Sequence, residues 1–559
     1  MPRPNTPTRR LALALAAALL CAFALHSAAF AQKEAAATIS GRVTDGERGA
    51  QGVTVTLFSN EPSQRFRVAG RARTDADGRF TMANVAPGRY QILPVAPAYV
   101  VEGLGTNYPP GRPLTIVAGE EVRDVDFKIA PGGVITGRVV DADGNPVIAE
   151  QVSAQPVEEN PGPPRFNADQ RDMTTDDRGV YRLFGLPPGR YRVSVGRAAD
   201  SGAVSFGRRK LYRRTFYPDA TEQKDARLVE VKSGIEATDV DISVGRALKT
   251  YRVAGRFVTA DTNQPVPNVT VGFATVDPRG RRMGGYGGSA TTNGRGEFIT
   301  EGLAPGHYSV FASTAFPLQE ATEFYSDPLF FEVTDGDVSG LVVKLKRGAT
   351  VSGVVTIEGV TDRAAAAQML AAVRVYPWIE VDRRQLGASM PPMRPVNVNP
   401  DGTFRLTGLS PGKLRIGTMN EAVRALSTAR VELNGANVLT GFELTEGAQI
   451  TGVHVVMVYG SATIVGQTTY ANGTLPPGAR VMAVARPAGQ PQGTGVGTGS
   501  RSAEVDGRGF FRIEGVPAGE YEVVVHVIAF GGRPRRSAPQ RVVVGDGGEA
   551  KVSPVVDLQ

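Results

Sequence analysis

The stretch Asp75-Ala-Asp-Gly-Arg-Phe80, followed by Val85-Ala-Pro-Gly-Arg-Tyr90, contains two turn motifs whose glycines, Gly78 and Gly88, are ten residues apart. An aspartate side chain accepts hydrogen bonds from the backbone that follows it, and glycine adopts positive φ, so the first motif predicts a hairpin turn. In the second motif proline fixes φ at one turn position and glycine takes the next. Each motif ends on an aromatic residue that begins a strand, so the stretch predicts two short strands joined by tight turns.

Both motifs recur four more times, always with the same ten-residue separation of their glycines. The later pairs are Gly179 and Gly189, Gly296 and Gly306, Gly402 and Gly412, and Gly509 and Gly519. Upstream of each pair lies a strand built around G-x-V or a close variant, with its glycine at Gly41, Gly137, Gly255, Gly353 or Gly466. These glycines are 96, 118, 98 and 113 residues apart, and each interval suits one β-sandwich of ordinary size.

Every repeat closes with a Gly-marked turn and an alternating strand. These closing strands are predicted at Val122–Ile129, Ala237–Val244, Val338–Leu345, Ile450–Val458 and Val552–Leu558. The chain is therefore predicted to be all-β, with five tandem seven-stranded Ig-like or prealbumin-like sandwiches at residues 37–130, 132–246, 250–347, 349–459 and 461–559, here named repeats 1 to 5. One helix is expected at residues 363–372, capped by Thr361 or Asp362.

The N-terminus has the pattern of a secretory signal peptide. Three arginines precede an apolar run from Leu11 to Leu25, and Ala29-Phe-Ala31 provides a cleavage site before Gln32. The run is shorter than the ~20 residues that a spanning helix needs. Residues 1–31 are therefore predicted to be removed, leaving a periplasmic or extracellular protein with no stable membrane span. The remaining 59 basic and 55 acidic side chains nearly balance, which argues against a nucleic-acid partner.

The sequence predicts no catalytic, cofactor or metal residues. The single cysteine, Cys21, lies in the signal peptide, and the mature chain has only His307, His454 and His526. A zinc peptidase needs histidine and glutamate at close spacing, but none of these histidines has a glutamate three residues on. A serine triad would have to take its base from the same isolated histidines. The sequence therefore favours a non-enzymatic protein.

The motifs resemble those of the carboxypeptidase regulatory-like domain, a prealbumin-like β-sandwich also classed with carbohydrate-binding-like folds. The similarity rests on G-x-V, on V-x-V as in Val53-Thr-Val55 and Val269-Thr-Val271, and on the two turns quoted above. It covers nearly all of residues 37–559. Repeat 4 departs from the pattern with Leu414 in place of tyrosine, and repeat 5 has Gln467-Thr468 where Arg-Val is usual. The resemblance implies an accessory domain of exported proteins in the bacterial cell envelope.

Between the V-x-V strand and the Asp-Gly turn, each repeat is predicted to carry a long polar loop. The five loops are Ser59–Arg73, Val157–Met173, Asp277–Ala290, Trp378–Arg394 and Pro487–Ser502. Loops on a rigid scaffold are the usual place for recognition. The fourth loop has the only tryptophan, Trp378, with Arg383 and Arg384 nearby. This tryptophan either stacks on a sugar or anchors a protein partner, or it covers the core of its own repeat.

A second candidate binding segment lies in repeat 2, where basic and aromatic residues interleave. Its candidate ligand-binding residues are Arg208, Arg209, Tyr212, Arg213 and Tyr217. The segment either binds an anionic polymer or surface, or it is a solvated basic loop. The sequence as a whole predicts an exported binding or structural protein that presents sandwich loops to a glycan or an envelope protein. The alternative is an accessory subunit of a separately encoded envelope peptidase or transporter.

Overall fold

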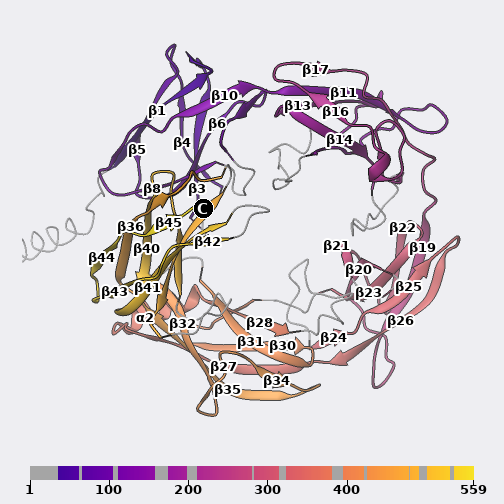
Figure 1. The fold of residues 1–559 in the computed structure, drawn as a ribbon. Coiled ribbons are helices and arrows are strands. Elements are labelled where there is room, and N and C mark those ends of the chain that lie inside the picture. The colour runs from indigo at the N-terminus through magenta and orange to yellow at the C-terminus, as the bar shows by residue number, and fades with distance from the viewer. Residues whose placement is uncertain are drawn as a thin grey trace, which may run out of the picture. The chain divides into compact units, whose positions relative to one another are not determined.

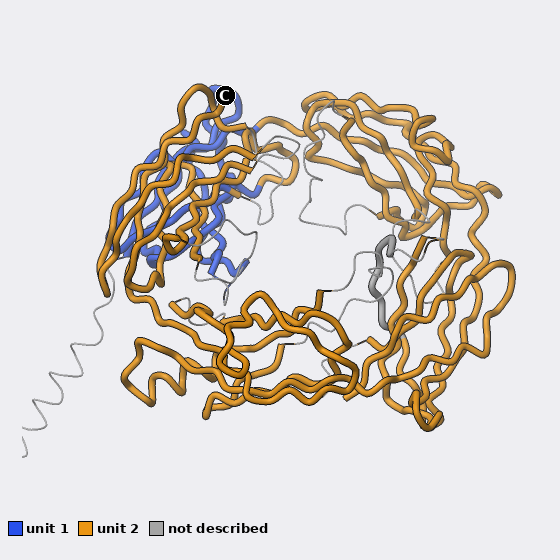
Figure 2. Tube along the Cα trace, turned by 60° about the horizontal axis from the view of Figure 1, so that its bottom comes forward, with its two compact units in different colours: residues 1–95, 112–129 blue, residues 96–111, 130–559 orange. Residues whose placement is uncertain are grey.

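The structure is a computed structural model, and its strands confirm the all-β prediction (Figure 1). It describes residues 36–61, 64, 66–104, 111–157, 174–197, 210–277, 279, 282–313, 323–380, 395–420, 425–476, 479–489, 500–528 and 534–559, with the side chains of 282–289 excepted. The predicted signal peptide lies outside these residues. The chain divides into two compact units (Figure 2), one formed by residues 1–95 and 112–129 and the other by residues 96–111 and 130–559. The number of independently folding domains stays a prediction.

Repeats 1 and 2 each contribute two groups of paired strands. In repeat 1 the first group has β1 (Ala37–Asp45), β2 (Arg48–Gly49), β5 (Arg79–Val85), β9 (Glu121–Val122) and β10 (Phe127–Pro131), and the second has β3 (Thr54–Ser59), β4 (Val68–Arg73), β6 (Gly88–Val95) and β8 (Arg112–Ile116). Strand β7 (Tyr99–Val101) follows β6 in the chain. In repeat 2 the first group has β11 (Gly133–Val140), β13 (Val180–Leu186), β17 (Glu236–Ala237) and β18 (Ile242–Ser243), and the second has β12 (Val152–Pro156), β14 (Gly189–Val195), β15 (Thr215–Phe216) and β16 (Val229–Val231). A 3-10 helix, η3, spans Gln223–Asp225.

Repeats 3 to 5 follow the same plan. Repeat 3 pairs β19 (Tyr251–Thr259), β22 (Glu297–Leu303), β24 (Phe324–Ser326) and β26 (Val338–Arg347), and separately β20 (Thr270–Val276), β21 (Arg282–Thr291), β23 (Gly306–Ala312) and β25 (Leu329–Val333). Repeat 4 pairs β27 (Ala349–Glu358), β30 (Thr403–Leu409), β32 (Leu426–Leu433), β33 (Ala436–Asn437) and β35 (Gln449–Tyr459), and separately β28 (Arg374–Glu380), β29 (Val396–Asn397), β31 (Gly412–Met419) and β34 (Phe442–Leu444). Repeat 5 has β36 (Ala462–Gln467), β40 (Phe510–Val516) and β44 (Glu549–Val552), then β37 (Thr469–Ala471) and β45 (Val555–Asp557), and finally β38 (Arg480–Pro487), β39 (Arg501–Glu504), β41 (Gly519–Ile528), β42 (Arg535–Arg536) and β43 (Gln540–Val544).

The glycine of each G-x-V strand, here called the first-strand glycine, lies in close contact with a neighbouring segment of its repeat. In repeat 3, a Cβ on Gly255 would lie 2.5 Å from the carbonyl oxygen of Leu341 and 2.7 Å from Cζ of Phe298. A Cβ on Gly41, Gly137 or Gly353 would likewise meet the carbonyl of Val125, Val240 or Val453, and one on Gly466 would meet the ring of Phe511. Only glycine allows these backbones to approach so closely.

The Asp-Gly turns are closed by their own side chains. Oδ1 of Asp75 accepts hydrogen bonds from the amides of Asp77 at 2.9 Å and Arg79 at 2.8 Å, and Gly78 has a φ of 76°. The carbonyl of Gly78 in turn accepts from the amide of Val43 at 2.8 Å, which attaches the turn to the first strand. The same 2.8 Å bond recurs from Val139 to Gly179, Phe257 to Gly296, Val355 to Gly402 and Thr468 to Gly509. The predicted turns are confirmed, and in four of the five repeats the side chain of the first motif residue accepts from the backbone amides that follow it.

The Pro-Gly turns also match the prediction of positive φ at their glycines. Gly88, Gly189, Gly306, Gly412 and Gly519 have φ values of 155°, 154°, 159°, 138° and 155°. In three repeats the tyrosine that follows donates its hydroxyl to a carbonyl inside the same turn, at 2.8 Å: Tyr90 to Ala86, Tyr191 to Pro187 and Tyr308 to Ala304. Burial raises the pKa of Tyr308 to about 12, as expected for a hydroxyl held inside the fold.

Two further predictions are confirmed, and one is corrected. The closing strands pair in parallel with the first strand of their repeat, as β35 does with β27, although those of repeats 1, 2 and 5 are each interrupted. The helix α2 (Arg363–Ala371) begins after Asp362, whose carboxylate accepts from the amides of Ala364 and Ala365. The predicted polar loops are partly strand, because β4, β21, β28 and β39 each occupy part of that segment. Each of these strands pairs with a strand of the same sheet.

Backbone groups contribute to two links between repeats, and Tyr325 of repeat 3 also forms a side-chain hydrogen bond with Glu446 of repeat 4. The amide of Gly348 donates to the carbonyl of Glu323 in repeat 3 at 2.9 Å, and a Cβ on Gly348 would lie 2.7 Å from the amide nitrogen of Leu409 in repeat 4. Gly460 repeats the arrangement between repeats 4 and 5, because its amide donates to Ala425 at 2.8 Å and a Cβ there would meet Gly515. We call Gly348 and Gly460 the linker glycines.

The first-strand glycine provides a test of this packing. Gly255→Ala is expected to destabilise repeat 3 by about 1–3 kcal/mol, because the added methyl group overlaps Leu341 and Phe298. The matched control is Gly336→Ala in the same repeat, where an added Cβ has no described atom within 4 Å. Urea unfolding of the full chain would measure both. Equal stability of the two variants would contradict the close-approach argument.

The turn of repeat 2 predicts a dependence on pH. The amide of Val180, and then that of Arg178, donate to Asp176 and lower the pKa of its carboxyl. This stabilisation is present above the unfolded-state pKa of about 3.9 and is lost as pH falls through the lower folded-state value. Asp176→Asn keeps an oxygen acceptor, as Asn293 does in repeat 3, but does not titrate. Unfolding at about pH 6 and about pH 3 should therefore show the wild type losing more stability than the variant. Equal losses of unfolding free energy between the two pH values in the wild type and in Asp176→Asn would refute the prediction.

Candidate binding surface on the fourth repeat

The structure places Trp378 on strand β28 and not on a loop. Val375, Pro377 and Ile379 face the core of repeat 4, and the residues between them face outward. The side chain of Trp378 is 49% exposed. The loop prediction was wrong because Pro377 and the charged residues after it were read as loop composition, whereas in an alternating strand every second residue is free to be polar. Arg383 and Arg384 lie outside the described residues.

Residues of β28 and the adjacent β31 surround Trp378. In this sheet Trp378 lies opposite Arg415, and Arg415 forms an ion pair with Glu380. Tyr376 lies opposite Gly417, and a Cβ on Gly417 would be 2.7 Å from Cε2 of Tyr376, so the phenol ring rests on the neighbouring strand. The outward residues Arg374, Tyr376, Trp378, Glu380, Lys413 and Arg415 are here called the aromatic platform. Of these six residues the sequence analysis selected only Trp378 and missed the other five, although the period of two along β28 was visible.

The second candidate segment separates into buried aromatic and exposed basic residues. Tyr212 is 5% exposed and belongs to the core of repeat 2, and Tyr217 is half-buried against the same core. The guanidinium of Arg227 lies 5.8 Å from the ring centre of Tyr217. Arg213 is exposed, while Arg208 and Arg209 lie outside the described residues. The two aromatic rings are therefore directed toward the core and away from a surface ligand.

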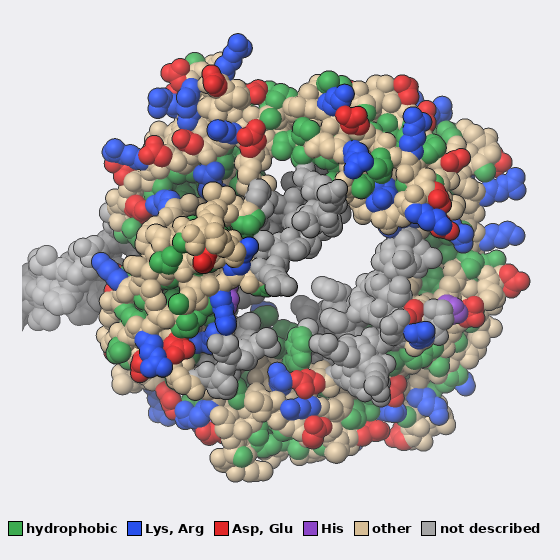
Figure 3. Space-filling model, viewed as in Figure 1, with side chains coloured by type: hydrophobic (Ala, Val, Ile, Leu, Met, Phe, Trp, Pro, Cys, Tyr) green, Lys and Arg blue, Asp and Glu red, His purple; other side chains and the backbone are tan. Residues whose placement is uncertain are grey.

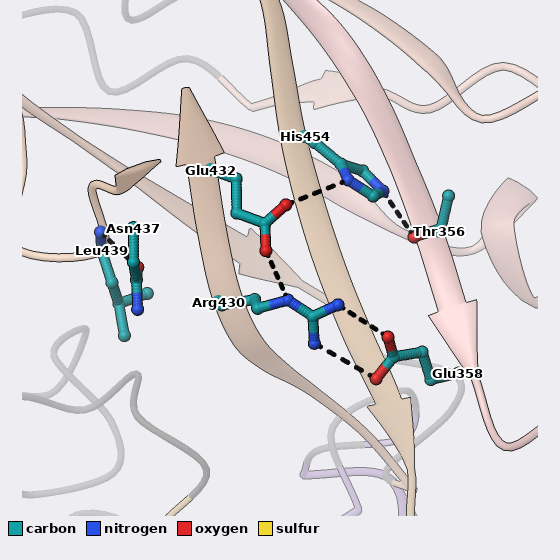
Figure 4. Close-up of polar contacts among 7 residues, drawn as sticks. All are labelled: Thr356, Glu358, Arg430, Glu432, Asn437, Leu439 and His454. Carbon is teal, nitrogen blue, oxygen red and sulfur yellow. Dashed lines mark hydrogen bonds and ion pairs between the residues drawn. The ribbon is translucent and has the colours of Figure 1, made fainter. Parts of the chain in front are cut away.

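A polar network on the other sheet of repeat 4 was not predicted (Figure 4). Arg430 on β32 binds both carboxylate oxygens of Glu358 on β27, at 2.7 and 3.3 Å, and Glu432 at 2.6 Å. Nε2 of His454 on β35 lies 2.8 Å from the hydroxyl of Thr356, and Nδ1 lies 3.5 Å from Glu432. Arg430 lowers the pKa of Glu358, and Glu358 raises that of Arg430. The network depends on the alignment of strands distant in sequence.

The described surface has mixed charge. On the face drawn in Figure 3, Lys and Arg side chains are interspersed with Asp and Glu side chains. No group of three or more His, Cys, Asp or Glu side chains in the described ranges is placed to hold a metal ion. Within those same ranges, no helix has the length and apolar character needed to cross a bilayer.

Comparison with solved structures gives matches of low similarity. A streptococcal ancillary pilin shares 14% identity, with 56% of this chain and 98% of that one covered and a TM-score of 0.24. A minor pilin of Streptococcus agalactiae shares 14% identity over 38% of this chain and 97% of its own, with a TM-score of 0.19. The major pilin subunit of Bacillus cereus shares 11% identity over 56% and 99%, with a TM-score of 0.15. These values are too low to transfer a function.

The comparison of families is more specific. No curated protein matches the chain. A sequence model of the carboxypeptidase regulatory-like domain matches residues 38–129 and 134–207, which lie in repeats 1 and 2. The turns and strand pairings of those repeats recur in the three that follow. Residues 38–129 and 134–207 therefore carry two tandem matches to the carboxypeptidase regulatory-like domain, and the other repeats share their turns and pairings.

Proposed function

We propose that this chain is an exported, non-enzymatic protein whose β-sandwich repeats form a scaffold, and that the aromatic platform of repeat 4 binds a glycan or an envelope protein. Export rests on the signal-peptide pattern of residues 1–31. The family supports a non-catalytic role, since the matched domain is described as regulatory-like. The binding role rests on the geometry of the platform.

The exposure of Trp378 is the observation that carries the proposal. A large aromatic side chain that is 49% exposed leaves apolar area in water, and tryptophan is enriched where partners bind. Its strand pairs with β31 from Arg374 to Glu380, so the backbone under the platform is held by ladder hydrogen bonds. A rigid surface loses little conformational entropy when it binds, which favours affinity. These features support a preformed contact surface.

The polar network of repeat 4 includes a hydroxyl, an imidazole and a carboxylate, but its setting does not suit catalysis. Thr356, His454 and Glu432 lie on adjacent strands, where the backbone amides form the sheet ladder and are not free to stabilise an oxyanion. Glu432 is also shared with Arg430 at 2.6 Å. The imidazole side chain is 40% exposed on an open sheet face, without the enclosed site that strengthens such electrostatics. A structural role for these ion pairs fits better.

The only tryptophan in the chain makes the proposal testable by fluorescence. Emission of residues 32–559 should be red-shifted and quenched by acrylamide, because Trp378 is half exposed. Trp378→Ala should leave the unfolding free energy within about 0.5 kcal/mol of wild type but remove binding on a glycan array and to an envelope extract. Phe330→Ala, which removes another exposed aromatic ring in repeat 3, is the matched control. Unchanged binding by Trp378→Ala would rule out the platform as the contact surface.

A further inference from the structure

We propose that the aromatic platform binds an acidic polysaccharide, with Tyr376 and Trp378 stacking on sugar rings and Arg374 binding a uronate carboxylate. This inference rests on the proposed binding function and names its ligand class. Two observations support it: the arrangement of the two rings and the distribution of charged side chains around them.

The two rings lie on one face of one strand. Tyr376 and Trp378 are two residues apart on β28, which places their Cβ atoms on the same side and about 6.7 Å apart along the strand. Tyr376 rests across Gly417, which has no side chain to lift the ring from the sheet. Pyranose rings have apolar C–H faces, and consecutive units of an extended glycan present such faces at regular intervals. Two neighbouring aromatic rings on one strand suit a ligand whose sugar faces recur in this way.

In the strand register Arg374 lies opposite Asn397 and Met419, away from the acidic residues that flank the other two cations of the platform. Arg415 is neutralised by Glu380, and Lys413 lies opposite Glu380 in one direction and Glu443 in the other. Arg374 is exposed at the start of β28 and forms no ion pair with any side chain in the described part of repeat 4. A guanidinium binds a carboxylate through two parallel hydrogen bonds. A sugar with a carboxylate therefore complements this end of the platform.

The platform suits a glycan better than a protein. The energetic centre of a protein interface is a fully desolvated pocket from which lysine, glutamate and aspartate are depleted. Here the two rings lie on an open sheet face with Glu380 and Lys413, which remain exposed or half exposed. Charged groups beside a stacking ring can donate to and accept from sugar hydroxyls. This mixture of ring faces and hydrogen-bonding groups favours a polyhydroxylated ligand.

The test compares acidic oligosaccharides with their neutral forms. Residues 32–559 would be titrated with hexameric α-linked galacturonate and β-linked mannuronate, and with the methyl ester of each, by calorimetry and Trp378 fluorescence. At least one acid should bind, and its ester should bind about tenfold more weakly because the ester cannot pair with Arg374. Arg374→Gln should bind acid and ester alike, and Trp378→Ala should bind neither. Arg405→Gln, which removes an exposed arginine from β30 on the other sheet of repeat 4, should behave as wild type.

The outcomes separate this inference from the proposed function. No binding of either acid, or equal preference for the acid in wild type and Arg374→Gln, would overturn the assignment of an acidic glycan. If the wild type then captured a neutral glycan or an envelope protein through Trp378, the proposed function would still stand. If Trp378→Ala bound every ligand as the wild type does, both proposals would be wrong.

Discussion

The close backbone approach at the first-strand glycine is the constraint on which each repeat depends. In repeats 1 to 3 this position brings the first strand against both a residue at or just before the closing strand and the aromatic residue after the Asp-Gly turn, whereas the atoms nearest Gly353 belong to Val453 and those nearest Gly466 belong to Phe511. Two residues further on, an amide donates to the turn glycine, so the same strand also holds the hairpin. A side chain at the glycine would disrupt all of these contacts at once. The intervals between motifs can differ in length, because direct contacts hold the joined residues in place whatever the number of residues between them.

The aromatic platform lies at positions whose side chains this close backbone approach does not constrain. The inward residues of β28 are apolar and belong to the core of repeat 4, while the outward residues have no packing role that demands a particular size. Exposed positions on a well-supported sheet tolerate change because few buried contacts depend on them. In a tandem array one repeat can therefore serve as a binding surface while the others maintain the scaffold, and the fold of every repeat stays the same.

Much of the fold could be predicted from sequence because its signals are local. The turn glycines, the cap at Asp362 and the alternating closing strands each involve residues within a few positions of one another. The site was predicted less well. Pro377 suggested a loop, yet it lies on β28 opposite Ile416 of β31. It is beyond the two residues that pair with β29, so no described strand pairs with its other side, and proline is tolerated at such an edge. The neighbours of Trp378 on β31, and the ion pairs around Arg430, depend on register between distant strands, which no local pattern specifies.

The linker glycines have a consequence for how such a chain can evolve. At Gly348 and Gly460 one amide is bonded backward and one α-carbon is packed forward against backbone. Backbone contacts of this kind do not depend on which side chains the adjoining repeats display. A gene segment duplicated in register would therefore encode a unit able to form the same backbone contacts at both ends. Between repeats 3 and 4 the side-chain hydrogen bond of Tyr325 with Glu446 would also have to be kept or replaced, whereas surfaces away from the joints would be free to diverge.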